Sequence, residues 1–218
     1  MKAIIFDLDG TLLDSEIIWF RAHRQMSQEH GKIWTVRHHL SHMSSDSAVS
    51  YAILERHLGA GWTHAQYAQR LHEIRDEMGC STPPLRPGAR VMLDDLSQHY
   101  QLALASAGPI AHVRQHLMRL GLLELFDVVL GGDDVQHGKP APDIYLNAVA
   151  RLGCDASDCI AVEDSPNGIG AALNAGLKTI AVPDAQFMPS REILNRCVMV
   201  TTSLHDINLA ALDRIWRS

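Results

Sequence analysis

The sequence lacks the features that mark secreted, membrane-spanning and nucleic-acid-binding proteins. Its four cysteines show no Cys-x-x-Cys spacing, which argues against a disulfide framework and predicts reduced thiols in a cytoplasmic protein. No apolar run approaches the ~18 residues that a membrane span needs. Asp7 and Asp9 also interrupt the N-terminal apolar run, so no secretory signal is expected there. Nineteen basic residues against 25 acidic ones give a net charge of −6, which argues against binding nucleic acids by neutralising their phosphates.

Apolar residues are plentiful, and their spacing predicts an α/β fold. They make up 46% of the 218 residues, enough for one core and a smaller appended unit. Short apolar runs typical of buried strands alternate with segments of helical spacing, and this alternation predicts a parallel sheet covered on both faces. The predicted strands are Ala3–Phe6, Leu102–Ala105, Val128–Leu130, Ile160–Val162 and Thr179–Val182. The predicted helices between them are Ile110–Leu120, Asp143–Leu152 and Asn167–Ala175.

The stretch that follows the first strand interrupts this rhythm. It contains no convincing buried strand and is predicted to form three amphipathic helices, Glu16–Glu29, Ser47–His57 and His64–Glu77. The proline-rich segment Ser81–Gly88 predicts an irregular linker that returns the chain to the sheet. We therefore predict a core formed by residues 1–14 and 86–218, a helical unit formed by residues 15–85, and a closing helix between His205 and Trp216.

Polar residues follow the first predicted strand at its carboxyl end, where parallel sheets bind ligands. Asp7 and Asp9 lie two positions apart, so in an extended segment their carboxylates face the same side. Two like charges so placed repel one another unless they share a cation or a proton. Gly10 permits a tight turn with close backbone approach, and Thr11 adds a hydroxyl. Taken alone, such a motif is more often a solvated turn than a site.

Three further strand ends carry chemistry of the same kind. Ser106 and Ala107 precede a helix whose N-terminus suits an anion. Lys139 stands before a proline and a helix, where it can deliver a fixed positive charge. The adjacent acids Glu163 and Asp164 suit a hard cation such as Mg²⁺. Each feature is ordinary by itself, but together they predict a site for Mg²⁺ and a phosphoryl group at one edge of the sheet.

These residues, in this order, resemble the haloacid dehalogenase superfamily of phosphotransferases. The matching segments are Asp7-Leu8-Asp9-Gly10-Thr11-Leu12-Leu13-Asp14, Ser106, Lys139-Pro140 and Glu163-Asp164-Ser165, and the resemblance covers nearly the whole chain. It is greatest to the sugar-phosphatase and β-phosphoglucomutase-like branch, in which a helical cap follows the first motif. The resemblance implies a Rossmann-like parallel-sheet core with an inserted α-helical cap, here residues 15–85.

The resemblance also implies a role for each matching residue. Asp7 would be the nucleophile that forms an aspartyl-phosphate, and Asp9 would protonate the leaving alcohol and then activate water. Mg²⁺ would be held, directly or through water, by Asp7, the backbone carbonyl of Asp9, Glu163 and Asp164. Phosphoryl oxygens would be bound by Ser106 and Lys139, with help from backbone amides near Gly10, Thr11 and Ala107.

The implied reaction is the hydrolysis of a small phosphorylated metabolite, such as a sugar phosphate, with Mg²⁺ as cofactor and no obligate protein partner. In this branch the core recognises the phosphoryl group and the cap contacts the rest of the substrate. The candidate cap contacts are Trp19, His23, His42 and Ser44.

Two other functions remain open. Phosphomutases of the same branch carry a cap histidine ten residues after the second aspartate, a position that Trp19 takes here, with His23 one helical turn later. Their cap loop also offers a basic residue for a second phosphate, whereas the segment Leu40–Asp46 has no Lys or Arg. A phosphorylatable receiver-like signalling module would share the aspartate, acids and lysine, but it would need neither Asp9 nor a helical insert.

Overall fold

The computed structural model of the chain describes residues 1–45, 47–80 and 82–217. Six strands form one parallel sheet in the order β3-β2-β1-β4-β5-β6. The strands are β1 (Ala3–Phe6), β2 (Gln101–Ala105), β3 (Val128–Leu130), β4 (Cys159–Glu163), β5 (Lys178–Ala181) and β6 (Met199–Val200). Phe6 at the end of β1 pairs with Leu104 of β2 and Val162 of β4, so the three central strands end side by side.

In the described part of the chain, five helices separate β1 from β2, and the other five alternate with the later strands. The first five are α1 (Glu16–Glu29), α2 (Val36–His42), α3 (Ser47–Leu58), α4 (His64–Glu77) and α5 (Ala89–Leu96). The others are α6 (Ile110–Arg119), α7 (Asp143–Leu152), α8 (Pro166–Asn174), α9 (Arg191–Leu194) and α10 (Leu209–Arg217). Short 3₁₀ turns lie at Leu123–Leu125, Gly132–Asp134, Ala156–Asp158 and Leu204–Asp206.

Side chains alternate along the buried strands, and each face of the sheet therefore needs its own cover. In β1, Ile4 and Phe6 join a cluster with apolar residues of α5, α6 and α10. Ala3 and Ile5 point the other way and pack with α7 and α8. The alternation confirms the predicted α/β class, in which both faces of a parallel sheet are buried under helices.

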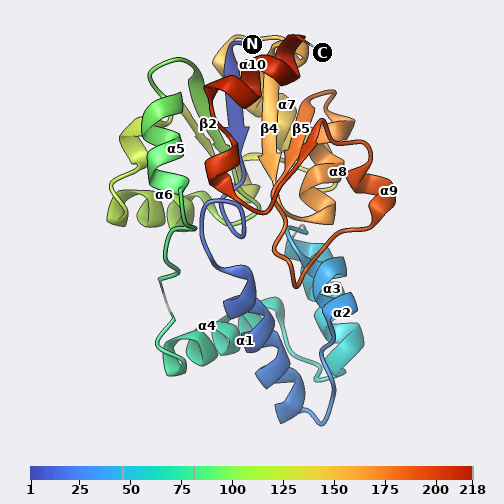
Figure 1. Ribbon diagram of the computed structural model, residues 1–218. Helices are drawn as coiled ribbons and strands as arrows, with labels where there is room; N and C mark the ends of the chain where they lie inside the picture. Colours follow the sequence, from blue (N-terminus) through green and yellow to red (C-terminus); the bar gives the residue numbers. More distant parts are fainter. Residues whose placement is uncertain (46, 81, 218) are drawn as a thin grey trace.

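Helices α1–α4 lie beyond the carboxyl edge of the sheet and have a hydrophobic cluster of their own (Figure 1). Met26 of α1, Leu54 of α3 and Tyr67 of α4 are buried in it. The two segments that connect these helices to the sheet run side by side, because Leu13 and Leu85 form an antiparallel bridge. The helical unit thus stands directly over the ends of the central strands.

Most predicted elements are present, with ends within one residue of the prediction. The prediction of a closing helix from His205 was wrong at its start, because residues 204–206 form a 3₁₀ turn and Asn208 Oδ1 then accepts the amide of Ala211 at 3.1 Å. The sequence analysis missed α2, α5, α9 and β6. The predicted linker is irregular from Thr82 onward, and Ser81 lies outside the described residues. Within residues 1–45, 47–80 and 82–217, no helix is long and apolar enough to cross a membrane.

The helices next to the sheet edge enclose several imidazoles. His23 is buried, and its ring stacks on Trp34 with the ring centres 5.1 Å apart. The ring of His42 meets it edge-on at 4.4 Å. Burial lowers the pKa of His23 well below its ordinary value and lowers the pKa of His42 to about 4. The folded chain therefore holds these rings neutral.

We predict that His23 makes the folded state acid-sensitive. Below about pH 6.5 the unfolded chain protonates His23 and the folded chain does not, so stability falls as pH falls. Relative to His23→Phe, the free energy of unfolding of the wild type should drop by up to ~1.4 kcal/mol per pH unit below that pH. Urea unfolding at a series of pH values checks this, and parallel curves for the two proteins would contradict it.

Candidate functional site

A buried lysine lies at the centre of the site. Lys139, in the loop before α7, donates from Nζ to Asp7 Oδ1 and to Glu163 Oε1, both at 2.6 Å. None of the three side chains is more than 2% exposed. Burial alone lowers the pKa of Lys139, but the two carboxylates outweigh it and raise the pKa above its ordinary value. The lysine is therefore a permanent positive charge beside Asp7.

Both carboxylate oxygens of Glu163 accept hydrogen bonds from neighbouring groups. Its Oε1 also accepts the hydroxyl of Tyr145 at 2.8 Å, and its Oε2 accepts the amides of Asp164 at 3.0 Å and Ser165 at 3.3 Å. A Cβ built on Gly168 would lie 1.8 Å from Glu163 Oε1, so the first turn of α8 closes tightly over the carboxylate. With its oxygens engaged, Glu163 is suited to fix Lys139 and the backbone of Asp164.

The acids of the site fit a hard divalent cation. Ligand atoms of Asp7, Glu163 and Asp164 lie within 4.8 Å of one another. Asp7 Oδ2 and Asp164 Oδ2 are buried, and neither has a hydrogen-bond partner among the described residues. Burial raises the pKa of both aspartates, more than Lys139 lowers that of Asp7. Two orphaned oxygens in a cluster of carboxylates are the donor set that Mg²⁺ prefers.

The turn after β1 packs against the side chain of Asp164 and positions it. Gly10 has a φ of +78°, and a Cβ there would lie 2.2 Å from Asp164 Oδ2. The Thr11 hydroxyl donates to Asp164 Oδ1 at 3.1 Å, and the Gly10 amide donates to Leu13 O and to Ser15 Oγ, each at 3.0 Å. The Gly10 amide is thus engaged within the protein and the Thr11 hydroxyl positions Asp164, while the predicted phosphate contact of the backbone amides near Gly10 and Thr11 stays a prediction.

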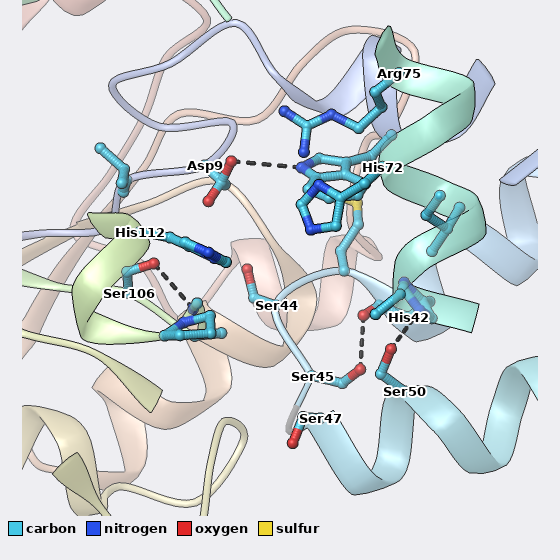
Figure 2. A pocket seen from close by; sticks show the side chains of 18 of the residues that line it. Asp9, His42, Ser44, Ser45, Ser47, Ser50, His72, Arg75, Ser106 and His112 are labelled. Atoms are coloured by element: carbon cyan, nitrogen blue, oxygen red, sulfur yellow. Dashed lines mark hydrogen bonds between the residues drawn. The ribbon is translucent and has the colours of Figure 1, made fainter. Parts of the chain in front are cut away.

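A cavity of about 480 Å³ lies between the sheet edge and α1–α4 (Figure 2). From the sheet it is lined by Asp7, Asp9, Ser106 and Ala107. From the helices it is lined by Trp19, His23, His42 and Ser44. The structure therefore brings the predicted cap contacts and the predicted strand-end residues to one space, with Lys139, Glu163 and Asp164 packed behind Asp7.

Asp9 differs from the other acids because it faces the helices. Its Oδ1 accepts the indole N–H of Trp19 at 3.4 Å (Figure 2). Its side chain is outside the group of three acids that could hold a metal ion. Asp7 and Asp9 thus face one cavity from different environments, one sealed beside Lys139 and the other within reach of a bound molecule.

Several residues at the site escaped the sequence analysis. Arg86 donates to the carbonyls of Gly10 and Val182, both at 2.6 Å, and so ties the turn after β1 to the end of β5. Arg75 of α4 lines the cavity, with its guanidinium carbon 4.1 Å from the centre of the Trp19 ring. One signal was available in the sequence: Arg75 falls on the apolar stripe of α4 formed by Tyr67, Leu71 and Ile74.

Glu16 was also missed, although it begins α1. It is buried, and burial together with Asp9 and Glu163 raises its pKa to about 8. Its Oε2 lies 2.9 Å from His39 Nε2, and burial lowers the pKa of His39 to about 4. The contact between these two buried groups joins α1 to α2 beside the cavity.

The fold and the site together are those of an α/β enzyme suited to phosphoryl chemistry, with a helical unit over its cavity. Comparison with known protein families agrees. The model of the haloacid dehalogenase-like hydrolases matches residues 4–182, and the chain belongs to that family. The resemblance predicted from the sequence motifs is confirmed.

Individual relatives cover most of the chain. The phosphorylated carbohydrates phosphatase of Thermotoga maritima is 34% identical over 181 residues, which cover 83% of this chain and 84% of the relative. Hexitol phosphatase B of Escherichia coli K12 is 32% identical over 187 residues, 83% of each chain. The crystal structure of CbbY from Rhodobacter sphaeroides in complex with phosphate has a TM-score of 0.79 at 28% identity and covers 98% of this chain and 99% of that one.

We predict that Gly168 is required to hold Glu163. In Gly168→Ala the new methyl group would displace the Glu163 carboxylate, and overpacking of this kind costs about 1–3 kcal/mol. Gly170→Ala on the same helix is the matched control, since its Cβ would meet Pro140 at an ordinary 3.6 Å. Chemical denaturation should show a loss of stability only in Gly168→Ala. Equal stabilities of the two variants would contradict the packing described.

Proposed function

We propose that the protein is a Mg²⁺-dependent phosphatase that hydrolyses small phosphorylated metabolites, sugar phosphates among them, through an aspartyl-phosphate on Asp7. The observation that carries the proposal is the buried contact of Asp7 with Lys139 inside a cluster of acids. It places a carboxylate, a fixed cation and a metal-binding set where one cavity meets the sheet edge. Relatives named as phosphatases of phosphorylated carbohydrates and hexitols support the substrate class.

In the first half of the reaction, an oxygen of Asp7 attacks phosphorus. The bond from Asp7 to phosphorus forms as the bond to the leaving oxygen breaks, and Asp9 gives its proton to that oxygen. The Lys139 charge, the Ser106 hydroxyl and the Ala107 amide stabilise the phosphoryl oxygens. Asp7, Asp164 and the backbone carbonyl of Asp9, with Glu163 behind them, would hold Mg²⁺, which would supply further charge neutralisation.

In the second half, Asp9 takes a proton from a water molecule as that water attacks phosphorus. The bond to Asp7 breaks, inorganic phosphate leaves, and both aspartates return to their starting states. Asp9 is suited to this double use because its side chain faces the cavity, where Oδ1 accepts the indole N–H of Trp19 at a long 3.4 Å. Asp7 is buried against Lys139, so it is suited to act as the nucleophile and not as a proton donor or acceptor.

Residues 15–85 act in this proposal as a cap that reads the leaving group, and residues 1–14 and 86–218 act as the catalytic core. The separate hydrophobic cluster of α1–α4 supports this division. So does the position of Trp19 and His42 in the cavity wall. A cap that opens and closes would admit water only for the second step. Cytoplasmic location and the lack of an obligate protein partner stay predictions.

A phosphomutase is the second candidate, favoured by one observation. Arg75 supplies from α4 the basic side chain in the cap that the segment Leu40–Asp46 lacks. Against it, His23 stacks on Trp34 and bonds from Nδ1 to the Trp19 carbonyl at 2.7 Å, so it does not replace Trp19 as the partner of Asp9. A receiver-like module is disfavoured by the cavity that the helices form over Asp7.

We predict that phosphate release from a panel of sugar monophosphates requires Mg²⁺ and Asp7. Asp7→Asn removes the nucleophile and should lower kcat/KM by at least about 1000-fold, and a chelator should abolish release by the wild type. Asp95→Asn, an exposed substitution on α5, is the matched control and should behave as the wild type. Undiminished release by Asp7→Asn, or release that survives the chelator, would contradict the mechanism.

A further inference from the structure

One wall of the cavity carries an unusual concentration of basic side chains. Arg75 and His72 reach it from α4, and His112, His116 and Arg119 reach it from α6. Arg75 is only 5% exposed, whereas His72, His112 and Arg119 lie at the open rim. The rings of His72 and His112 meet with their centres 6.0 Å apart, so the cap and the core build this wall together.

These groups are close enough to disfavour one another's charge. Burial lowers the pKa of His116, and Arg75, Arg119 and His112 lower it further. Burial also lowers the pKa of His72, with further lowering by Arg75 and His112. The acids that face the wall are Asp9 and the exposed Asp76. The fixed positive charge of this wall is therefore carried by Arg75 and Arg119, and fixed positive charge at the edge of a cavity favours an incoming anion.

The wall adjoins the position where the leaving group would lie. The guanidinium carbon of Arg75 is 4.1 Å from the centre of the Trp19 ring, and Trp19 Nε1 is 3.4 Å from Asp9 Oδ1. In Figure 2, Arg75 and His72 lie on the side of α4, facing Asp9 and His112 across the cavity. Only one indole ring thus separates the guanidinium from the acid that serves the leaving oxygen. A group held by Arg75 would belong to the leaving half of a substrate.

We infer that this wall is a subsite for a second anionic group, so that the preferred substrate is a short phosphate ester whose leaving group carries a carboxylate or another phosphoryl group. The inference rests on the proposed phosphatase function. A guanidinium binds either anion through two parallel hydrogen bonds, and burial strengthens such a pair. The cavity volume of about 480 Å³ is in the usual range for small-molecule sites and has room for both ends of such a substrate.

The test compares phosphate esters in matched pairs that differ by one anionic group. Glycerol 3-phosphate against 3-phosphoglycerate, and sorbitol 6-phosphate against 6-phosphogluconate, test a carboxylate. Fructose 6-phosphate against fructose 1,6-bisphosphate tests a second phosphoryl group. The wild type should favour the anionic member of at least one kind of pair by about tenfold or more in kcat/KM, which identifies the anion that the wall accepts.

The variants separate the subsite from general attraction to phosphate. Arg75→Met keeps an apolar stem on Trp19 and should lower kcat/KM for the anionic member by about 10- to 100-fold, with less than about threefold change for the neutral one. Arg119→Gln, at the exposed rim, should shift the preference in the same direction and keeps the test valid if Arg75→Met does not fold. Arg114→Gln, on the exposed side of α6, removes the same charge outside the cavity and should leave the preference unchanged.

Each outcome decides between the two proposals. Preference of the wild type for the neutral members, or equal losses for both members in the Arg75 and Arg119 variants, would overturn the subsite and leave the phosphatase intact. Absence of phosphate release from every compound would overturn the phosphatase and the subsite together.

Discussion

The structure depends on a charge that has been taken out of water. Lys139 is fully buried, and a buried ammonium persists only when carboxylates surround it at hydrogen-bond distance. Asp7 and Glu163 meet that need from the ends of β1 and β4, two neighbouring strands, and the loop before α7 must close over them to bring the lysine in. The strand order brings Asp7 and Glu163 together, and the close approach of Gly168 in the first turn of α8 fixes the Glu163 carboxylate against the lysine. Removing either acid would leave the lysine with an uncompensated charge.

The same contact explains why the cluster suits a metal. With all four groups ionised, three acids and one lysine carry 1 − 3 = −2, which a divalent cation would balance. The carboxylate oxygens of Asp7 and Asp164 that lack hydrogen-bond partners among the described residues are the atoms available to bind that cation. Asp9 is free of this arrangement because its carboxylate turns to Trp19. The buried charge cluster and the carboxylate of Asp9, which faces the cavity, thus lie in separate environments, and the proposed mechanism gives charge neutralisation to the first and proton transfer to the second.

The sequence predicted what depends on local pattern and missed what depends on three-dimensional approach. Asp7, Ser106 and Glu163 could be assigned to one edge of the sheet because the end of an apolar run marks the end of a buried strand. Parallel strands then bring those ends together. The seven residues of α2 escaped because a short polar helix has little periodicity. Arg75 and Arg86 escaped because an arginine on a helix or between prolines is usually solvated. Their contacts with Trp19 and with the Gly10 carbonyl arise only from folding. Gly10 and Thr11 lie in the turn after β1, but their hydrogen bonds to Ser15 and Asp164 could not be predicted from residue type.

The central claim of the proposed function is the covalent intermediate on Asp7. The most direct measurement is acid quenching during turnover with Mg²⁺ and a sugar phosphate, followed by borohydride reduction and peptide mass spectrometry. Reduction converts an aspartyl-phosphate to homoserine, so the account predicts homoserine at position 7 and an unmodified Asp9 in the same peptide. Turnover without modification at Asp7, or modification of another acid, would contradict it.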